Sequence, residues 1–355
     1  MPRPFVMKAL FFAVVPPRAG LLATALVLFV CVGLASQSIA QTQNGTAAAD
    51  FLNIPIGARA IGLGGAFVAL ADDASAIYWN PAGLARQDMR QFSAEHASWL
   101  VGVDLNYASL MLPTTFGTVA VGITSMSVPE MEVTTAEMQD GTGETFSAGS
   151  FAVTMAYARN LTDQFSLGAN VKYIREHVAS SSATGIAVDI GTLFTTPFYG
   201  VRLGAAIANF GTPMRMTGPE LLVPIDIDPN NAGNNNNVRG ELQTDQFDLP
   251  RIMRVGIAGE PYQSEGTRVT LAIDALSPSA GGQHVNVGAE VGLLGDLVQL
   301  RGGVNELFLA DSPRSFTLGA GLRYTFGNLN IAADYAYEAF QYFDGVNRFT
   351  VSVRF

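Results

Sequence analysis

The last residues of the chain alternate strictly between apolar and polar side chains. In the segment 348–355, Phe349, Val351, Val353 and Phe355 share one side, and arginine, threonine, serine and arginine follow on the other. Successive residues of a β-strand point to opposite faces of a sheet, so the pattern predicts a strand with one apolar and one charged face. The same alternation recurs at 267–275, 284–293, 314–326 and 329–339.

Nine further strand candidates bring the count to about fourteen. Each candidate is near the 9–11 residues that a tilted membrane strand requires. No helical heptads, no second domain and no repeat at a solenoid period accompany them. The nine segments are 92–101, 103–112, 117–127, 147–159, 165–177, 183–194, 200–210, 250–260 and 297–306.

The connections between these segments alternate in length. Outer-membrane barrels combine short periplasmic turns with longer extracellular loops and an even number of strands. If residue 355 is periplasmic, all of the long connections are extracellular. The short turns are 113–116, 160–164, 195–199, 261–266, 294–296 and the region of Gly327, and the long connections are 128–146, 211–249, 307–313 and 340–346.

The composition favours a membrane protein over a soluble one. Charged residues make up only 14% of the chain and the mean hydropathy is +0.26, whereas soluble domains average about 25% charged residues. A soluble β-sandwich or propeller is the alternative, but it would normally carry charges on its outer face. Here the apolar faces are continuous and end in Tyr or Phe, as in an aromatic girdle at the lipid boundary. We therefore predict an all-β fold: a transmembrane antiparallel β-barrel over residues 92–355.

The N-terminus has the pattern of a secretory signal peptide. Arg3, Lys8 and Arg18 precede or border an apolar run at 19–34, and small residues precede a cleavage site after Ala40. The apolar run is short for a retained membrane anchor, which needs about 20 residues. We expect residues 1–40 to be removed on export to the outer membrane of a Gram-negative-type bacterium.

Export changes the chemistry available to the mature chain. The single cysteine, Cys31, lies within the predicted signal, so no disulfide or thiolate metal site is expected. Without residues 1–40 the chain has 17 basic and 30 acidic residues. A nucleic-acid partner is excluded by this acidity, because a phosphate backbone requires clusters of Lys and Arg.

Catalytic and metal-binding patterns are weak. The three histidines have no metal-ligand spacing, no serine lies in a G-x-S-x-G motif, and the glycines at 62–65 fail a dinucleotide fingerprint because Phe67 occupies its last glycine position. Asp226, Asp228 and Asn230 resemble the start of a calcium loop, but position six is Asn231 rather than glycine. We expect an ordinary polar loop there, no cofactor, no metal and no enzymatic activity.

The polar faces of the predicted strands carry charges of both signs. Inside a barrel they can pair with one another and bond to a plug, or they can line a polar pathway for a solute. Because both signs are present, no simple anion or cation selectivity follows. The lumen charges are Arg254, Arg268, Asp274, Glu290, Arg301, Arg323, Asp334, Glu338 and Arg354.

The segment 57–85 is unlike the rest of the chain. It is dense in Gly and Ala, contains the acid pair Asp72 and Asp73, and ends with the turn residues Asn80, Pro81 and Ala82. It is too polar to face lipid as a strand and too apolar for a linker. We predict that residues 41–91 form a hatch inside the barrel, in which glycines permit tight turns and close approach to the wall. Lumenal arginines are the expected partners of Asp72 and Asp73.

The hatch segment also resembles a known family, the PorV/PorQ outer-membrane proteins, which are similar to the FadL-like superfamily. The resemblance implies a fourteen-stranded barrel with an N-terminal hatch. The residues that carry it are Gly57, Ala58, Arg59 and Ala60, then Gly62, Leu63, Gly64, Gly65, Ala66 and Phe67, then Ala71 to Ala74, and Trp79, Asn80, Pro81, Ala82, Gly83 and Leu84, together with the terminal Phe355.

Two functions of different classes follow from the resemblance. PorV-like proteins are accessories of type IX secretion that bind exported cargo, and this is the first expectation, with secreted cargo and other secretion components as partners. FadL-like proteins move long-chain fatty acids or other hydrophobic compounds, and this is the alternative. In both cases outer-membrane lipid surrounds the barrel, and the strand with Phe349, Val351, Val353 and Phe355 is expected to be the signal for the barrel-assembly machinery.

Overall fold

The computed structural model describes residues 47–227, 230, 238–310 and 312–355. The predicted signal peptide therefore lies outside the described residues. Within the described ranges, no helix has both the length and the apolar character needed to cross a membrane.

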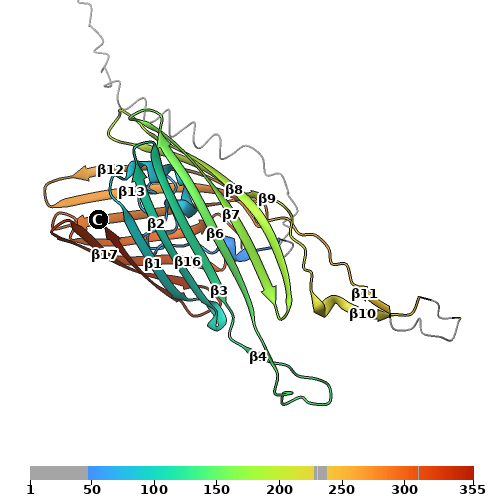
Figure 1. Ribbon diagram of the computed structural model, residues 1–355. Coiled ribbons are helices and arrows are strands. Elements are labelled where there is room, and N and C mark those ends of the chain that lie inside the picture. The colour runs from blue at the N-terminus through green and yellow to red at the C-terminus, as the bar shows by residue number, and fades with distance from the viewer. Residues whose placement is uncertain (1–46, 228–229, 231–237, 311) are drawn as a thin grey trace, which may run out of the picture. The chain divides into compact units, whose positions relative to one another are not determined.

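A closed antiparallel barrel of fourteen strands forms the body of the molecule (Figure 1). Each strand pairs with its neighbour in sequence, and the first strand pairs with the last, with Ala94 opposite Val351. The strands are β1 (Gln91–Ser98), β2 (Asp104–Thr114), β3 (Gly117–Ser127), β6 (Ala148–Asn160), β7 (Phe165–Val178), β8 (Ser181–Thr195), β9 (Arg202–Gly211), β12 (Ile252–Gln263), β13 (Thr267–Pro278), β14 (His284–Leu293), β15 (Val298–Leu307), β16 (Arg314–Phe326), β17 (Leu329–Phe340) and β18 (Val346–Arg354). The predicted fold class and strand number are confirmed.

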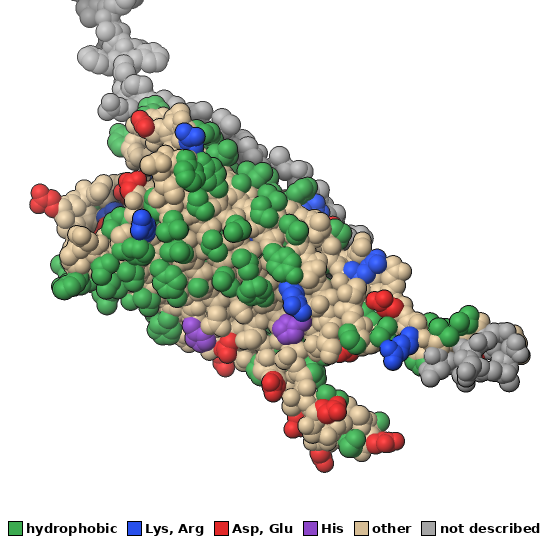
Figure 2. Space-filling model, viewed as in Figure 1, with side chains coloured by type: hydrophobic (Ala, Val, Ile, Leu, Met, Phe, Trp, Pro, Cys, Tyr) green, Lys and Arg blue, Asp and Glu red, His purple; other side chains and the backbone are tan. Residues whose placement is uncertain are grey.

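The alternation of side chains sorts each strand into an outer and an inner face. On β18, Phe349 is 58% exposed and Val351 is 51% exposed, whereas Arg348, on the inner face of the same strand, is fully buried. Apolar side chains cover much of the barrel surface in Figure 2. An apolar outer surface with buried charges inside is the arrangement that a lipid environment requires.

Long connections leave one end of the barrel, and two of them contain small hairpins. One consists of β4 (Met131–Glu132) and β5 (Thr145–Phe146), and the other of β10 (Leu222–Ile225) and β11 (Val238–Glu241), which follows the 3-10 turn η4 (Pro219–Leu221). Both hairpins extend away from the barrel wall (Figure 1). Another 3-10 turn, η3 (Leu100–Gly102), ends the first predicted strand earlier than its pattern suggested.

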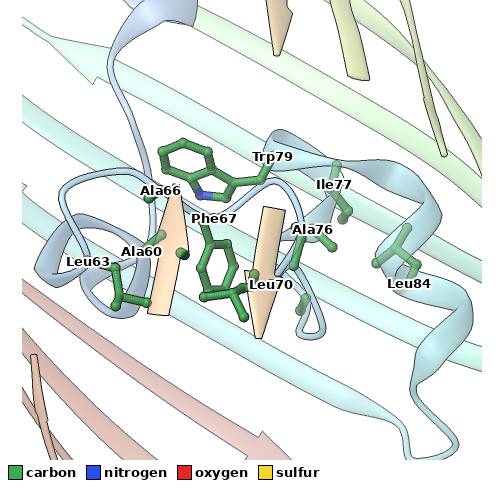
Figure 3. Packing of buried hydrophobic residues seen from close by; sticks show 14 of the residues in the cluster. Ala60, Leu63, Ala66, Phe67, Leu70, Ala76, Ile77, Trp79 and Leu84 are labelled. Carbon is green, nitrogen blue, oxygen red and sulfur yellow. The ribbon is translucent and has the colours of Figure 1, made fainter. Parts of the chain in front are cut away.

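The predicted hatch is folded inside the barrel as short helical turns. These are η1 (Asp50–Asn53), α2 (Ala58–Gly62), α3 (Ala76–Trp79) and η2 (Pro81–Arg86). Helix α2 packs against β15 to β18, and the turn η2 packs against β3, β6, β7 and β8. The hatch therefore contacts opposite parts of the wall. Figure 3 shows Phe67, Leu70 and Trp79 packed together at its centre, where all three are at most 2% exposed.

Candidate functional site

Glycines on both sides allow the hatch backbone to lie directly against the barrel wall. Gly64 has φ +65°, a conformation that residues with a Cβ rarely adopt, and its amide donates to Thr317 Oγ1 at 3.0 Å. On the wall, a Cβ at Gly303 would overlap the backbone of Leu63 and Gly64. Hatch atoms occupy the space of a Cβ at five wall glycines: Gly168, Gly191, Gly204, Gly288 and Gly303.

Asn80 joins the two halves of the hatch to the wall. Its side-chain amide donates to the carbonyl of Val68 at 2.9 Å and to the carbonyl of Thr192 on β8 at 3.0 Å. Its side-chain oxygen accepts from the amide of Ala82 and so caps η2, whose first residue is Pro81. The Asn-Pro-Ala sequence therefore starts a helical turn that leads to β1 and at the same time fixes that turn to the barrel.

Arg59 is the centre of the charged contacts that the hatch makes. Its Nη1 pairs with Asp72 and, at 3.2 Å, with Asp73, while its Nε lies 3.7 Å from Glu290 on β14. The prediction that lumenal arginines pair with the two aspartates was wrong, because the hatch supplies its own arginine from α2. Arg59 instead connects the hatch acids to a wall carboxylate.

This contact also sets the ionisation of the hatch acid. Burial acts to raise the pKa of Asp72, but the positive charge of Arg59 and its hydrogen bond outweigh burial, so the pKa of Asp72 lies below its usual value. Asp72 is therefore a carboxylate at neutral pH, and the pair with Arg59 is charged.

Four of the nine predicted lumen charges pair with one another, and Glu338 pairs with two further arginines. Arg301 lies 2.6 Å from both Glu290 and Asp334, and Arg268 lies 2.8 Å from Glu290. Glu338 lies 3.6 Å from Arg314 and from Arg348. These contacts form a network on β13 to β18, on the side of the barrel that α2 packs against.

The remaining predicted lumen residues have other roles. Asp274 accepts hydrogen bonds from the hatch amides of Phe67 at 2.7 Å and Val68 at 2.8 Å. Arg354 donates to Gln91 at 3.2 Å. Among the described residues, neither Arg254 nor Arg323 has a carboxylate within 4 Å.

Sequence reasoning missed several charges buried in the lumen. Lys172 on β7 lies 2.6 Å from Asp189 on β8 and donates to Asn209, and Arg348 lies 3.1 Å from Glu95 on β1. The signal was present, because each lies on the polar face of its strand. The pairs could not be found from one strand alone, since their partners lie on neighbouring strands.

Two cavities lie between the hatch and the wall, at opposite ends of the strands. The loop-end cavity has a volume of about 190 Å³ and is lined by hatch residues such as Tyr78 and Trp79 and by Ile252, Arg254 and Leu276 of the wall. The turn-end cavity has a volume of about 360 Å³ and is lined by both apolar and polar residues. They include Arg59, Asp73, Asp296, Arg323 and Arg354. Both cavities have charged residues in their lining, and the loop-end cavity also has the hatch aromatics Tyr78 and Trp79.

The other predicted sites are placed as follows. Phe349 and Val351 face outward on β18, which closes the barrel against β1, and Phe355 follows at its end. The calcium-like sequence lies partly outside the described residues, since Asp228 and 231–237 are not described. In the described part of the chain, no group of three or more His, Cys, Asp or Glu side chains is arranged to hold a metal ion.

Comparisons with known proteins agree with this architecture. Residues 28–187 match an uncharacterised protein family (UPF0164). No curated protein matches the chain. Among solved structures, the toluene transporter TodX of Pseudomonas putida aligns with a TM-score of 0.54 and 12% identity over 84% of this chain and 97% of that one. The monoaromatic hydrocarbon channel CymD aligns with a TM-score of 0.53 and 13% identity over 85% and 97%.

The fold defines the class of protein. A closed antiparallel barrel of fourteen strands, apolar outside and filled by an N-terminal hatch, is the fold that this chain shares with TodX and CymD. At 12–13% identity the similarity establishes the fold alone. The resemblance to the PorV/PorQ family stays a prediction.

Proposed function

We propose that this protein admits small hydrophobic compounds through the outer membrane, by way of a hatch that moves within the barrel. The observation that carries the proposal is the loop-end cavity, which places the hatch aromatics Tyr78 and Trp79 opposite Ile252 and Leu276 of the wall. Ligand sites are concave and mainly apolar, with a few polar groups that set orientation. The structural neighbours are described as a toluene transporter and a hydrocarbon channel, which supports the same class of solute.

The proposed movement requires the hatch to break its contacts with the barrel wall. These contacts are close approaches at glycines and polar bonds to several strands, among them the bond of Asn80 to β8 and the contact of Arg59 with Glu290 on β14. A solute in the loop-end cavity contacts α3 directly through Tyr78 and Trp79. Binding there is therefore coupled to the position of the hatch.

The proposal includes the location and processing of the chain. We propose removal of residues 1–40, a hatch over 41–91 and a membrane barrel over 92–355, in contact with outer-membrane lipid. The apolar outer face of β18, which ends at the aromatic Phe355, is proposed as the segment that the barrel-assembly machinery recognises. No step of this function requires an enzymatic group or a cofactor.

Uptake by cells tests the proposed function. Cells that express the protein in their outer membrane should take up toluene faster than cells with an empty vector, because the barrel bypasses the lipopolysaccharide layer. In the same assay, Gly64→Val strains the hatch turn at φ +65° and displaces the hatch, so it should raise uptake above the wild-type rate. Equal uptake with and without the protein, at normal amounts of folded barrel, would contradict the proposal.

A second candidate function is handling of exported proteins, as in type IX secretion. The observation that favours it is the β10–β11 hairpin, on which Leu222, Ile225 and Val238 are exposed beyond the barrel wall. Exposed apolar side chains on a projecting element suit contact with another protein. Deleting the gene should then change the set of cell-surface proteins, and deleting only 222–241 should reproduce that change. An unaltered surface proteome would exclude this role.

A further inference from the structure

Arg254 is the unusual residue of the loop-end cavity. It projects from the lumen face of β12, is 2% exposed and lies between hatch aromatics, with its guanidinium 5.0 Å from the ring of Tyr78 and 5.6 Å from that of Trp79. Among the described residues its guanidinium makes one hydrogen bond, a long one of 3.4 Å from Nη1 to the carbonyl of Tyr78. Its Nε is buried with no hydrogen-bond partner in that part of the chain.

The other charges around this cavity are compensated. Arg314 lies 3.4 Å from Glu306 and 3.6 Å from Glu338, and Glu338 also lies 3.6 Å from Arg348. Asp274, on the strand next to Arg254, directs one carboxylate oxygen to the hatch amides and forms no ion pair with Arg254 within 4 Å. Within the described residues, Arg254 is thus the cation of the cavity lining that lacks a carboxylate partner.

A buried arginine without a counter-ion is costly for a protein to keep. Isolated buried charges are rare, and a guanidinium normally pairs with a carboxylate or phosphate through two parallel hydrogen bonds. The contact with two aromatic rings offsets part of this cost, but it leaves Nε without a partner. An anionic group supplied from outside the protein would complete the site.

The size of the cavity limits what such a ligand can be. An engineered cavity of about 150 Å³ holds benzene, so the 190 Å³ here suits a molecule with one ring or a short chain. Ile252 and Leu276 would contact its apolar body, while Tyr78 and Trp79 offer aromatic faces beside the cation.

We infer that the loop-end cavity binds a small organic acid: a carboxylate held by Arg254, with an apolar ring or short chain against the aromatics of α3. The inference rests on the proposed function and adds compact carboxylic acids to the neutral hydrocarbons as substrates. Benzoate has the required charge and size, and benzamide is its neutral counterpart of the same shape.

Calorimetric titration of the purified full-length mature chain in detergent tests the assignment. Benzoate should bind more tightly than benzamide by about tenfold or more, because a charge-assisted bond replaces a neutral one. R254Q should lower benzoate affinity by a similar factor and leave benzamide within about twofold. R254K, which keeps the positive charge, should retain a preference for benzoate over benzamide. It provides the test if R254Q does not fold.

The matched control is R323Q, which removes an arginine that likewise lacks an ion pair among the described residues but lines the turn-end cavity. R323Q should leave benzoate binding unchanged. Equal affinity for benzoate and benzamide, or an equal loss in R323Q and R254Q, would overturn the inference. If toluene uptake persists without benzoate binding, this inference fails and the proposed function stands. If both are absent, both fail.

Discussion

Replacing Gly303 with valine should raise the ion conductance of the purified barrel in a planar bilayer strongly. The Cβ of residue 303 would overlap the hatch backbone at Leu63 and Gly64, which cannot rotate away as a flexible side chain could. Overpacking costs about 1–3 kcal/mol, which corresponds to about a 5- to 150-fold change in the population of displaced hatch. We therefore expect conductance to increase by a factor in this range.

The neighbouring Gly302 provides the control for this result. A Cβ at Gly302 meets no other atom within 4 Å, because adjacent strand residues point to opposite faces. Gly302→Val should therefore leave conductance at the wild-type level. If both variants conduct alike, the packing of the hatch against β15 does not close the barrel.

Replacing Arg59 with methionine should have the other large effect. Asp72 and Asp73 then lose their cation, while Glu290 keeps Arg268 and Arg301, and breaking a buried ion pair by removing one partner costs about 3–5 kcal/mol. The lost free energy weakens the packing of the hatch in the barrel. We expect R59M to conduct ions continuously in the bilayer assay while the barrel keeps its resistance to detergent.

A double-mutant cycle separates this contact from general damage. D72N with D73N removes the acids that Arg59 holds, so adding R59M to that variant should raise conductance much less than R59M does alone. As a control, D248N removes the acid of an exposed ion pair outside the hatch, in which Asp248 lies 3.5 Å from Arg251. D248N should leave the conductance unchanged. Additive effects in the cycle would contradict the role given to Arg59.

The same contact predicts a pH dependence with a definite sign. The pKa of Asp72 lies below its usual value in the folded protein, so its carboxylate stabilises the hatch fully above the unfolded pKa, about 4. That contribution is lost as the pH falls through the lowered folded value. Wild-type conductance should accordingly stay low at neutral pH and rise only in acid.

Strand patterning made the barrel predictable from the sequence. The face of each strand follows directly from the period of two, as the exposed Phe349 beside the buried Arg348 shows. The hairpins β4–β5 and β10–β11 were not predicted, because strands of two to four residues are too short to display a period. Alternation therefore predicts only strands that are long enough to repeat it.

The hatch was predictable as a unit but not in its contacts. Its composition and place in the chain indicated a plug, and the turn at Asn80 and Pro81 was expected. The partner of Asp72 depended on how α2 folds back on the later loop, which brings Arg59 thirteen residues away into contact. The role of Arg254 depended on α3 lying against β12, a contact between segments distant in sequence. Such contacts carry no local signal in a single sequence.

Cross-linking the hatch to the wall tests the central claim most directly. The amide of Ala58 donates to Thr350 Oγ1 on β18 at 2.9 Å, so the hatch and the wall are in contact there, and cysteines are introduced at Ala58 and Thr350 for oxidation. The chain has no other cysteine once Cys31 is removed with the predicted signal. Cells with the oxidised double variant should take up toluene at the rate of cells without the protein, and reduction should restore uptake. Unchanged uptake with a fully oxidised hatch, verified by mass spectrometry, would contradict the claim that the hatch moves.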